Sequence, residues 1–87
     1  MTWHTTQHPW GTGRTMHTDG PFTITAWIDE GPDGGESLRY DLEDGEYPQG
    51  EHRSAAAAKR HAARLAASVP DSIDRHYIYA LGLRVAA

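Results

Sequence analysis

The sequence predicts a small two-layer α+β domain, with one Ala-rich helix packed on a mostly antiparallel sheet of three or four strands. Three stretches lead to this expectation. Residues 54–69 (SAAAAKRHAARLAASV) repeat apolar side chains at helical spacing, while residues 21–30 (PFTITAWIDE) and 75–85 (RHYIYALGLRV) alternate in the manner of strands. The expected order of elements is β-β-α-β.

The helix over residues 54–69 is expected from composition and from its ends. Alanine, arginine, lysine and leucine are good helix formers. Ser54 is a suitable N-cap, and Pro70 stops the helix because proline disfavours a helical residue before it. Ala58, Ala62, Leu65 and Val69 then form a narrow apolar stripe that faces the sheet.

The first two strands are expected to form an antiparallel hairpin. Phe22, Ile24, Ala26 and Ile28 share one face of the first strand, and Trp27 lies on the other. The turn cluster GPDGG follows, and residues 36–42 resume the alternation with Leu38, Tyr40 and Leu42 pointing inward.

The remaining segments are assigned by their turn formers and by their apolar content. We expect residues 43–53 (EDGEYPQGEHR) to form a polar connection and residues 70–74 to form a second loop. Residues 75–85 are apolar on both faces near their start, which is typical of a central strand.

Two parts are expected along the chain. We expect residues 1–20 to form an N-terminal arm, either flexible or docked through Trp3 or Trp10, and residues 21–87 to form a single α+β domain. There is no cysteine, which suits a reducing cytoplasm, and no apolar run long enough to cross a bilayer. Seven arginines against one lysine, with no asparagine, suggest a high-GC genome such as that of an actinobacterium or its phage.

The charges are segregated along the chain. Nine of the twelve carboxylates fall between Asp29 and Glu51, and basic residues dominate from Arg53 to Arg64. Charge asymmetry steers the choice of partner. The expected protein-binding surface combines two aromatic anchors with acidic residues: Trp27, Asp29, Glu30, Asp41, Glu43, Asp44, Glu46 and Tyr47.

The basic side of the helix supports an alternative functional hypothesis. Arg53, Lys59, Arg60 and Arg64 could contact phosphates, which makes nucleic-acid binding an open alternative. The net charge of -4 and the absence of a known DNA- or RNA-binding motif count against it.

No motif indicates chemistry. The six histidines do not follow metal-ligand spacing, the serines lack an activating context, and GPDGG lacks the ending of a phosphate-binding loop. We therefore expect no enzyme activity, no catalytic or metal-binding residues and no cofactor.

The run from FTITAWIDE through YDLEDGEYPQGEHRSAAAAKRHAARLA resembles the layout of HicB-type antitoxin domains, with strands, an acidic polar loop and a helix opened by Ser54. The resemblance covers about half of the chain, and it departs from the family because DLEDGEYPQG replaces the usual proline-glycine loop. It implies a role in protein binding.

Together these observations predict a non-catalytic protein-binding module, a small regulator or inhibitor from a phage or accessory gene that acts through its acidic surface. The HicB-like domain and the nucleic-acid-binding module stay open as alternatives. No membrane partner is expected, and pairing of open sheet edges into a homodimer is compatible with each reading.

Overall fold

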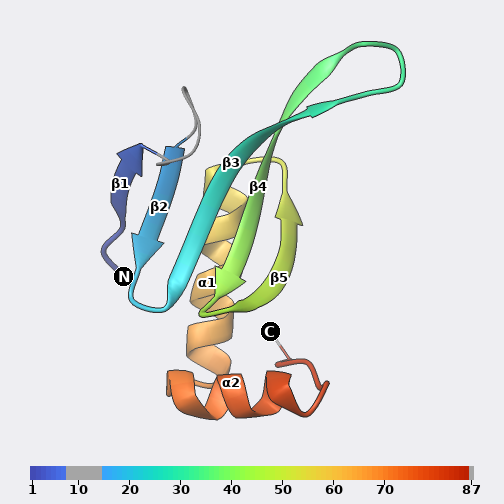
Figure 1. The fold of residues 1–87 in the computed structure, drawn as a ribbon. Helices are drawn as coiled ribbons and strands as arrows, with labels where there is room; N and C mark the ends of the chain where they lie inside the picture. The colour runs from blue at the N-terminus through green and yellow to red at the C-terminus, as the bar shows by residue number, and fades with distance from the viewer. Residues whose placement is uncertain (8–14, 87) are drawn as a thin grey trace.

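The computed structural model describes residues 1–7 and 15–86, and it is a five-stranded antiparallel sheet followed by two helices (Figure 1). The strands lie in the sheet in chain order, so each pairs with its neighbour in sequence. They are β1 (His4–Gln7), β2 (Thr15–Asp19), β3 (Phe22–Glu30), β4 (Glu36–Asp44) and β5 (Tyr47–His52), and the helices are α1 (Ala55–Ser68) and α2 (Ser72–Ala80). The predicted β-β-α-β order with three or four strands was therefore wrong, although a helix does pack on an antiparallel sheet.

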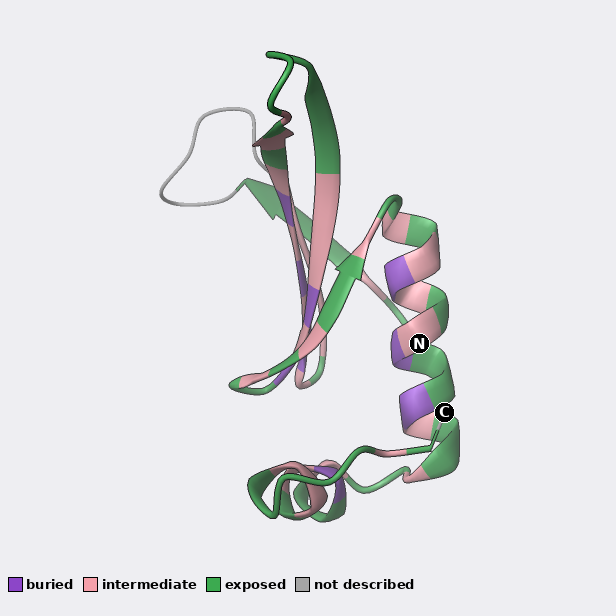
Figure 2. Ribbon diagram, turned by 90° about the vertical axis from the view of Figure 1, so that its right-hand side faces the viewer, coloured by how far each residue is buried: buried purple, intermediate pink, exposed green. Residues whose placement is uncertain are grey.

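The predicted Ala-rich helix is confirmed as α1. The hydroxyl of Ser54 accepts a hydrogen bond from the amide of Ala57 at 3.1 Å, and Val69 caps the other end. Ala58, Ala62 and Leu65 are buried against the sheet, as the apolar stripe predicts (Figure 2). Because two of these three side chains are single methyl groups, α1 contributes little apolar area to the core.

The predicted hairpin of residues 21–42 is confirmed as β3 and β4. Ile24 pairs with Leu42 and Ala26 with Tyr40 on the face toward α1. Beyond this point the two strands continue past the rest of the sheet as a projecting arm, shown at the upper right of Figure 1. The paired residues Ile28 and Leu38 lie on this arm and are exposed.

The predicted strand over residues 75–85 was wrong, because most of this segment is the helix α2. The carboxylate of Asp71 accepts hydrogen bonds from the amides of Ile73 and Asp74, which starts the helix. At the other end Gly82, with φ of 76°, donates to the carbonyl of Tyr79, and Leu83 donates to the carbonyl of Ile78. This pair of bonds is the Schellman motif, which favours glycine at that position.

The predicted polar connection over residues 43–53 was also wrong, because it contains β5. Gly45 has φ of 63°, which allows a tight turn between β4 and β5. The strand signal is weak because β5 includes Pro48 and Gly50, and its register is shifted by a bulge opposite Leu42 and Glu43. Proline and a bulge are typical of an edge strand, and β5 is the last strand of the sheet.

The described part of residues 1–20 extends the sheet on its other side. His4 to Gln7 of β1 pair with Thr15 to Thr18 of β2, and β2 pairs with β3. Trp3 packs against the core and lies beneath the ammonium group of Lys59, 5.8 Å from the ring centroid. Trp10, the other proposed docking residue, lies outside the described residues.

The hydrophobic core lies between α1 and one face of the sheet. It consists of few side chains: Phe22, Ile24, Leu42, Ala58, Ala62 and Leu65. Neither α1 nor α2 covers the opposite face (Figure 2), which we call the outer face of the sheet. Within the described residues, neither helix is long and apolar enough to cross a membrane.

Candidate functional surfaces

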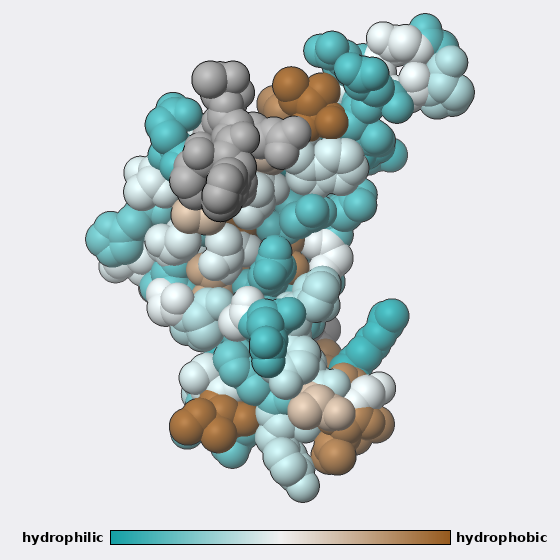
Figure 3. Space-filling model, in the orientation of Figure 1, coloured by the Kyte–Doolittle hydropathy of each residue, from teal (hydrophilic) through white to brown (hydrophobic). Residues whose placement is uncertain are grey.

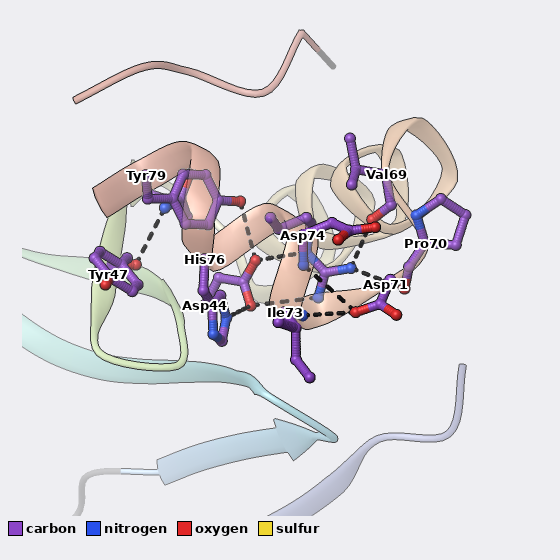
Figure 4. A network of polar contacts seen from close by, with 11 residues as sticks. Asp44, Tyr47, Val69, Pro70, Asp71, Ile73, Asp74, His76 and Tyr79 are labelled. Atoms are coloured by element: carbon purple, nitrogen blue, oxygen red, sulfur yellow. Dashed lines mark hydrogen bonds and ion pairs between the residues drawn. The ribbon is translucent and has the colours of Figure 1, made fainter. Parts of the chain in front are cut away.

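A buried carboxylate joins the sheet to α2. Asp44, at the end of β4, has the same parity as Tyr40 and Leu42 and so points toward the helices. Its Oδ2 accepts hydrogen bonds from Arg75 Nε at 2.7 Å and from the Tyr79 hydroxyl at 2.9 Å. Its Oδ1 accepts one from His76 Nε2 at 2.8 Å (Figure 4). One carboxylate therefore holds three side chains of α2.

The guanidinium of Arg75 also closes the end of α1. Its Nη1 donates to the carbonyls of Val69 and Pro70 at 2.8 Å and 3.1 Å. Asp44 is 0% exposed and Arg75 is 2% exposed, so both charges lie away from water. A buried ion pair is tolerated only where hydrogen bonds satisfy both partners, as they do here.

The network changes the titration of its members. Burial by itself raises the pKa of the Asp44 carboxyl, but the hydrogen bonds from Arg75, His76 and Tyr79 outweigh burial and lower it below its ordinary value. Burial and the hydrogen bond to Asp44 raise the pKa of Tyr79 to about 12. Asp44 is thus held as the anion and Tyr79 as the neutral phenol near neutral pH.

The outward side of α2 is apolar. Ile73, Tyr77 and Leu81 follow each other at intervals of four residues and are 78%, 68% and 58% exposed. We call these three residues the α2 stripe, of which Leu81 is the residue that caps the end of the helix. In Figure 3, hydrophobic residues lie at both ends of α2, along the lower edge of the molecule. The helix therefore points its polar side inward to Asp44 and its apolar side to the surface, the reverse of an ordinary surface helix.

Half of the predicted protein-binding residues share the outer face of the sheet. Trp27, Asp29, Asp41 and Glu43 alternate with the inward residues of β3 and β4. Arg39, opposite Trp27, lies 3.7 Å from a carboxylate oxygen of Asp29. The ring nitrogen of Trp27 is buried, and no described residue accepts its hydrogen.

The other predicted residues lie elsewhere. Asp44 is buried in the network above, so it offers no contact surface. Glu30 ends β3 on the projecting arm, and Glu46 lies in the turn before β5. The ring of Tyr47 packs against His76 and Tyr79, with centroids 5.5 Å apart in each case. The structure therefore divides the predicted acidic surface between several places.

One part of the outer face is hollowed. Asp41 of β4 lies directly opposite Glu51 of β5, and Glu43 lies opposite Pro48 next to the bulge. These residues line a depression of about 350 Å³. Like charges opposite one another in a sheet are destabilising. Among the described residues no ion pair within 4.0 Å relieves these three carboxylates.

The predicted basic residues lie on α1 and just before it. The ammonium group of Lys59 lies over Trp3, while Arg53, Arg60 and Arg64 are exposed. His52 Nε2 and His61 Nδ1 are hydrogen-bonded at 2.9 Å. Burial lowers the pKa of both histidines, and the positive charge of Arg64 lowers both further. Both imidazoles are therefore neutral at pH 7.

The sequence contained signals for the features that were missed. Asp44 continues the inward parity of Leu38, Tyr40 and Leu42, which predicts an inward carboxylate in need of a cationic partner. Asp71 and Gly82 bracket a nine-residue segment with cap residues at both ends. In the described residues no group of three or more histidine, aspartate or glutamate side chains is arranged to hold a metal ion.

Comparisons with protein-family models, with curated proteins and with solved structures found no match to this chain. The layout that resembles HicB-type domains depended on an irregular loop between the second strand and the helix, and that loop contains β5. The surfaces described above are therefore the basis for a functional hypothesis.

Proposed function

We propose that the protein is a non-catalytic protein-binding module that presents α2 as a preformed helical ligand to a groove on another protein. The observation that carries the proposal is the exposure of Ile73, Tyr77 and Leu81 on a helix whose opposite side is fixed to Asp44. Helices that bind in grooves use apolar anchors at this kind of spacing. Large exposed apolar side chains in a row are otherwise costly for a small domain.

The Asp44 network supports this role because it orders the helix in advance. A nine-residue helix is too short to be stable alone in water. The bonds from Arg75, His76 and Tyr79 to Asp44 hold it in place and determine which side faces outward. A ligand ordered before binding loses less conformational entropy when the complex forms.

The size of α2 favours a concave partner over a second copy of the same helix. Nine residues span about 14 Å at about 1.5 Å per residue. Stable interfaces bury roughly 800 Å² on each partner, and two short helices side by side do not reach this area. A groove that encloses the sides of α2 also reaches the exposed Asp71 and Asp74, so the expected partner has a basic rim near the start of the helix.

The proposal is tested with Ile73→Ser and Tyr77→Ser variants. Extracts of the source cell are passed over the immobilised protein, and each captured protein is then purified and titrated against the variants by calorimetry. We expect a partner whose affinity falls at least tenfold in both variants. The control is Leu38→Ser, another large apolar residue that is exposed (53%), on the projecting arm. A partner that binds the Tyr77→Ser variant as tightly as the original chain would rule out α2 as the ligand.

The acidic depression on the outer face is a second candidate for partner contact. Asp41, Glu43 and Glu51 line this depression of about 350 Å³, and their mutual repulsion would be relieved by a lysine or arginine from a partner. The Asp41→Asn and Glu51→Gln variants would then slow association and reduce its salt dependence. An unchanged association rate in both variants would exclude this surface.

A further inference from the structure

A second, larger groove lies beside β5 and shares Pro48 and Gly50 of its lining with the acidic depression. Its walls come from β5, from α1, from the end of α2 and from residues 82–85, and its volume is about 620 Å³. Volumes of 300 to 1,000 Å³ are usual for sites that enclose small organic molecules. None of the residues of the α2 stripe lines this groove.

One part of the lining is apolar and aromatic. The rings of Tyr47 and Tyr79 lie 5.5 Å apart and are inclined by 45°, and Leu65 of α1 contributes a buried side chain. The Tyr79 ring cannot easily turn away, because its hydroxyl is bonded to Asp44. This part of the groove offers fixed aromatic faces to a flat apolar group.

The other part of the lining is polar and carries positive charge. Arg84 and His61 line the groove, and no aspartate or glutamate does. His61 Nδ1 is bonded to His52 Nε2, and within the described residues the other ring nitrogen of His61 has no hydrogen-bond partner. Arg64 lies near enough to lower the pKa of His61, so it adds to the positive potential at this end.

We propose that this groove binds a small organic anion, a carboxylate or phosphate joined to a flat apolar body. The apolar body lies on the rings of Tyr47 and Tyr79, and the anionic group lies between Arg84 and His61. Arginine suits this role because its planar guanidinium donates two parallel hydrogen bonds to a carboxylate or phosphate. An anion here pairs with the positive charge of Arg84, which no aspartate or glutamate of the lining balances.

The observations favour a small molecule over a strand of nucleic acid. The chain carries a net charge of -4, and Arg84 is the only lysine or arginine among the described residues that line the groove. Nucleic acids are bound through many phosphate contacts along an extended basic surface. One arginine and one histidine in an aromatic groove can together bind one anionic group.

The test uses the full chain labelled with ¹⁵N and four probes: indole-3-acetate, its neutral amide, inorganic phosphate and a single-stranded oligonucleotide. We expect indole-3-acetate to shift the amide signals of Gly82 and Leu83, which line the groove but not the acidic depression. The neutral amide and phosphate alone should bind at least tenfold more weakly, because each has only half of the recognised chemistry.

The Arg84→Gln variant should weaken binding of indole-3-acetate at least tenfold. The control is Arg39→Gln, which removes the same charge on the outer face, where Arg39 pairs with Asp29. Equal binding of the acid and its amide would overturn the proposal, as would equal effects of the two variants. Signal shifts produced only by the oligonucleotide would overturn it in favour of nucleic-acid binding.

Discussion

Asp44 and Arg75 are 31 residues apart in the chain, and they form a buried ion pair with 2.7 Å between Oδ2 and Nε. Replacing Asp44 by Asn keeps the shape of the side chain but leaves the Arg75 charge without a counter-ion. Removing one partner of a buried pair typically costs about 3–5 kcal/mol. We expect Asp44→Asn to lower the free energy of unfolding in urea by this amount. The neighbouring change Glu43→Gln, on the outer face, is the control, and equal losses in the two variants would contradict the structural role of the pair.

Tyr79 should make the protein sensitive to alkali. Its pKa is raised to about 12 in the folded protein, above the ordinary value of 10.0. A group with a raised pKa gives its full stabilisation below its unfolded pKa and loses it as the pH rises toward the folded value. We therefore expect stability to fall between about pH 10 and pH 12. Absorbance of ionised tyrosine should show one late titration, and Tyr79→Phe should abolish it. If all tyrosines titrate together, the bond to Asp44 is not maintained in solution.

The His52–His61 pair should make the protein sensitive to acid. Burial, together with nearby positive charge, lowers the pKa of each imidazole below its ordinary value of 6.5. As the pH falls, the unfolded chain therefore takes up protons before the folded chain does. The stabilisation that depends on the neutral imidazoles is fully present above about pH 6.5 and is lost as the pH falls through the folded pKa values. The free energy of unfolding should differ less between pH 7 and pH 5 in the His61→Gln variant than in the original chain. His4→Gln, at an exposed position on β1, is the control and should leave the difference unchanged.

Gly45 should be the least replaceable of the turn glycines. A Cβ at Gly45 would lie 2.7 Å from Cε1 of His76, whereas a Cβ at Gly34 would meet nothing within 4 Å. Both residues have positive φ, so alanine costs about 1–2 kcal/mol of backbone strain at either position. We expect Gly45→Ala to cost more than Gly34→Ala in chemical denaturation. A double-mutant cycle with His76→Ala should recover the difference, and a coupling of zero would mean that the turn moves away from the helix.

The sequence predicted the elements whose signals are local and unambiguous. Ser54 and Pro70 mark the ends of α1, and the alternation in residues 22–28 identifies β3. The segment YIYALGL fits both a strand and a helix, because residues spaced by two and by four are apolar together. The capping hydrogen bonds at Asp71 and Gly82 stabilise the helical form of this segment, α2, over a strand. The strand β5 has a weak signal in the sequence because it contains Pro48 and Gly50, and its position depends on pairing with β4.

The candidate surfaces were less predictable because they depend on how the elements pack. The run of acidic residues between positions 29 and 51 predicts one surface, but alternation along the strands directs their side chains to opposite faces of the sheet. The exposure of Ile73 and Tyr77 follows from the attachment of Arg75 and Tyr79 to Asp44, a contact between distant parts of the chain. Periodicity alone assigns those apolar residues to the interior.

The order of the strands has a consequence for how the chain folds. Since every strand pairs with the one before it, the sheet can grow hairpin by hairpin without closing a long loop, which keeps the entropic barrier at each step small. The bonds of Asp44 span 31 to 35 residues and join the end of β4 to α2. On the ribosome, the sheet can be completed while α2 is still being synthesised. This order lets the sheet form before α2 is attached to it.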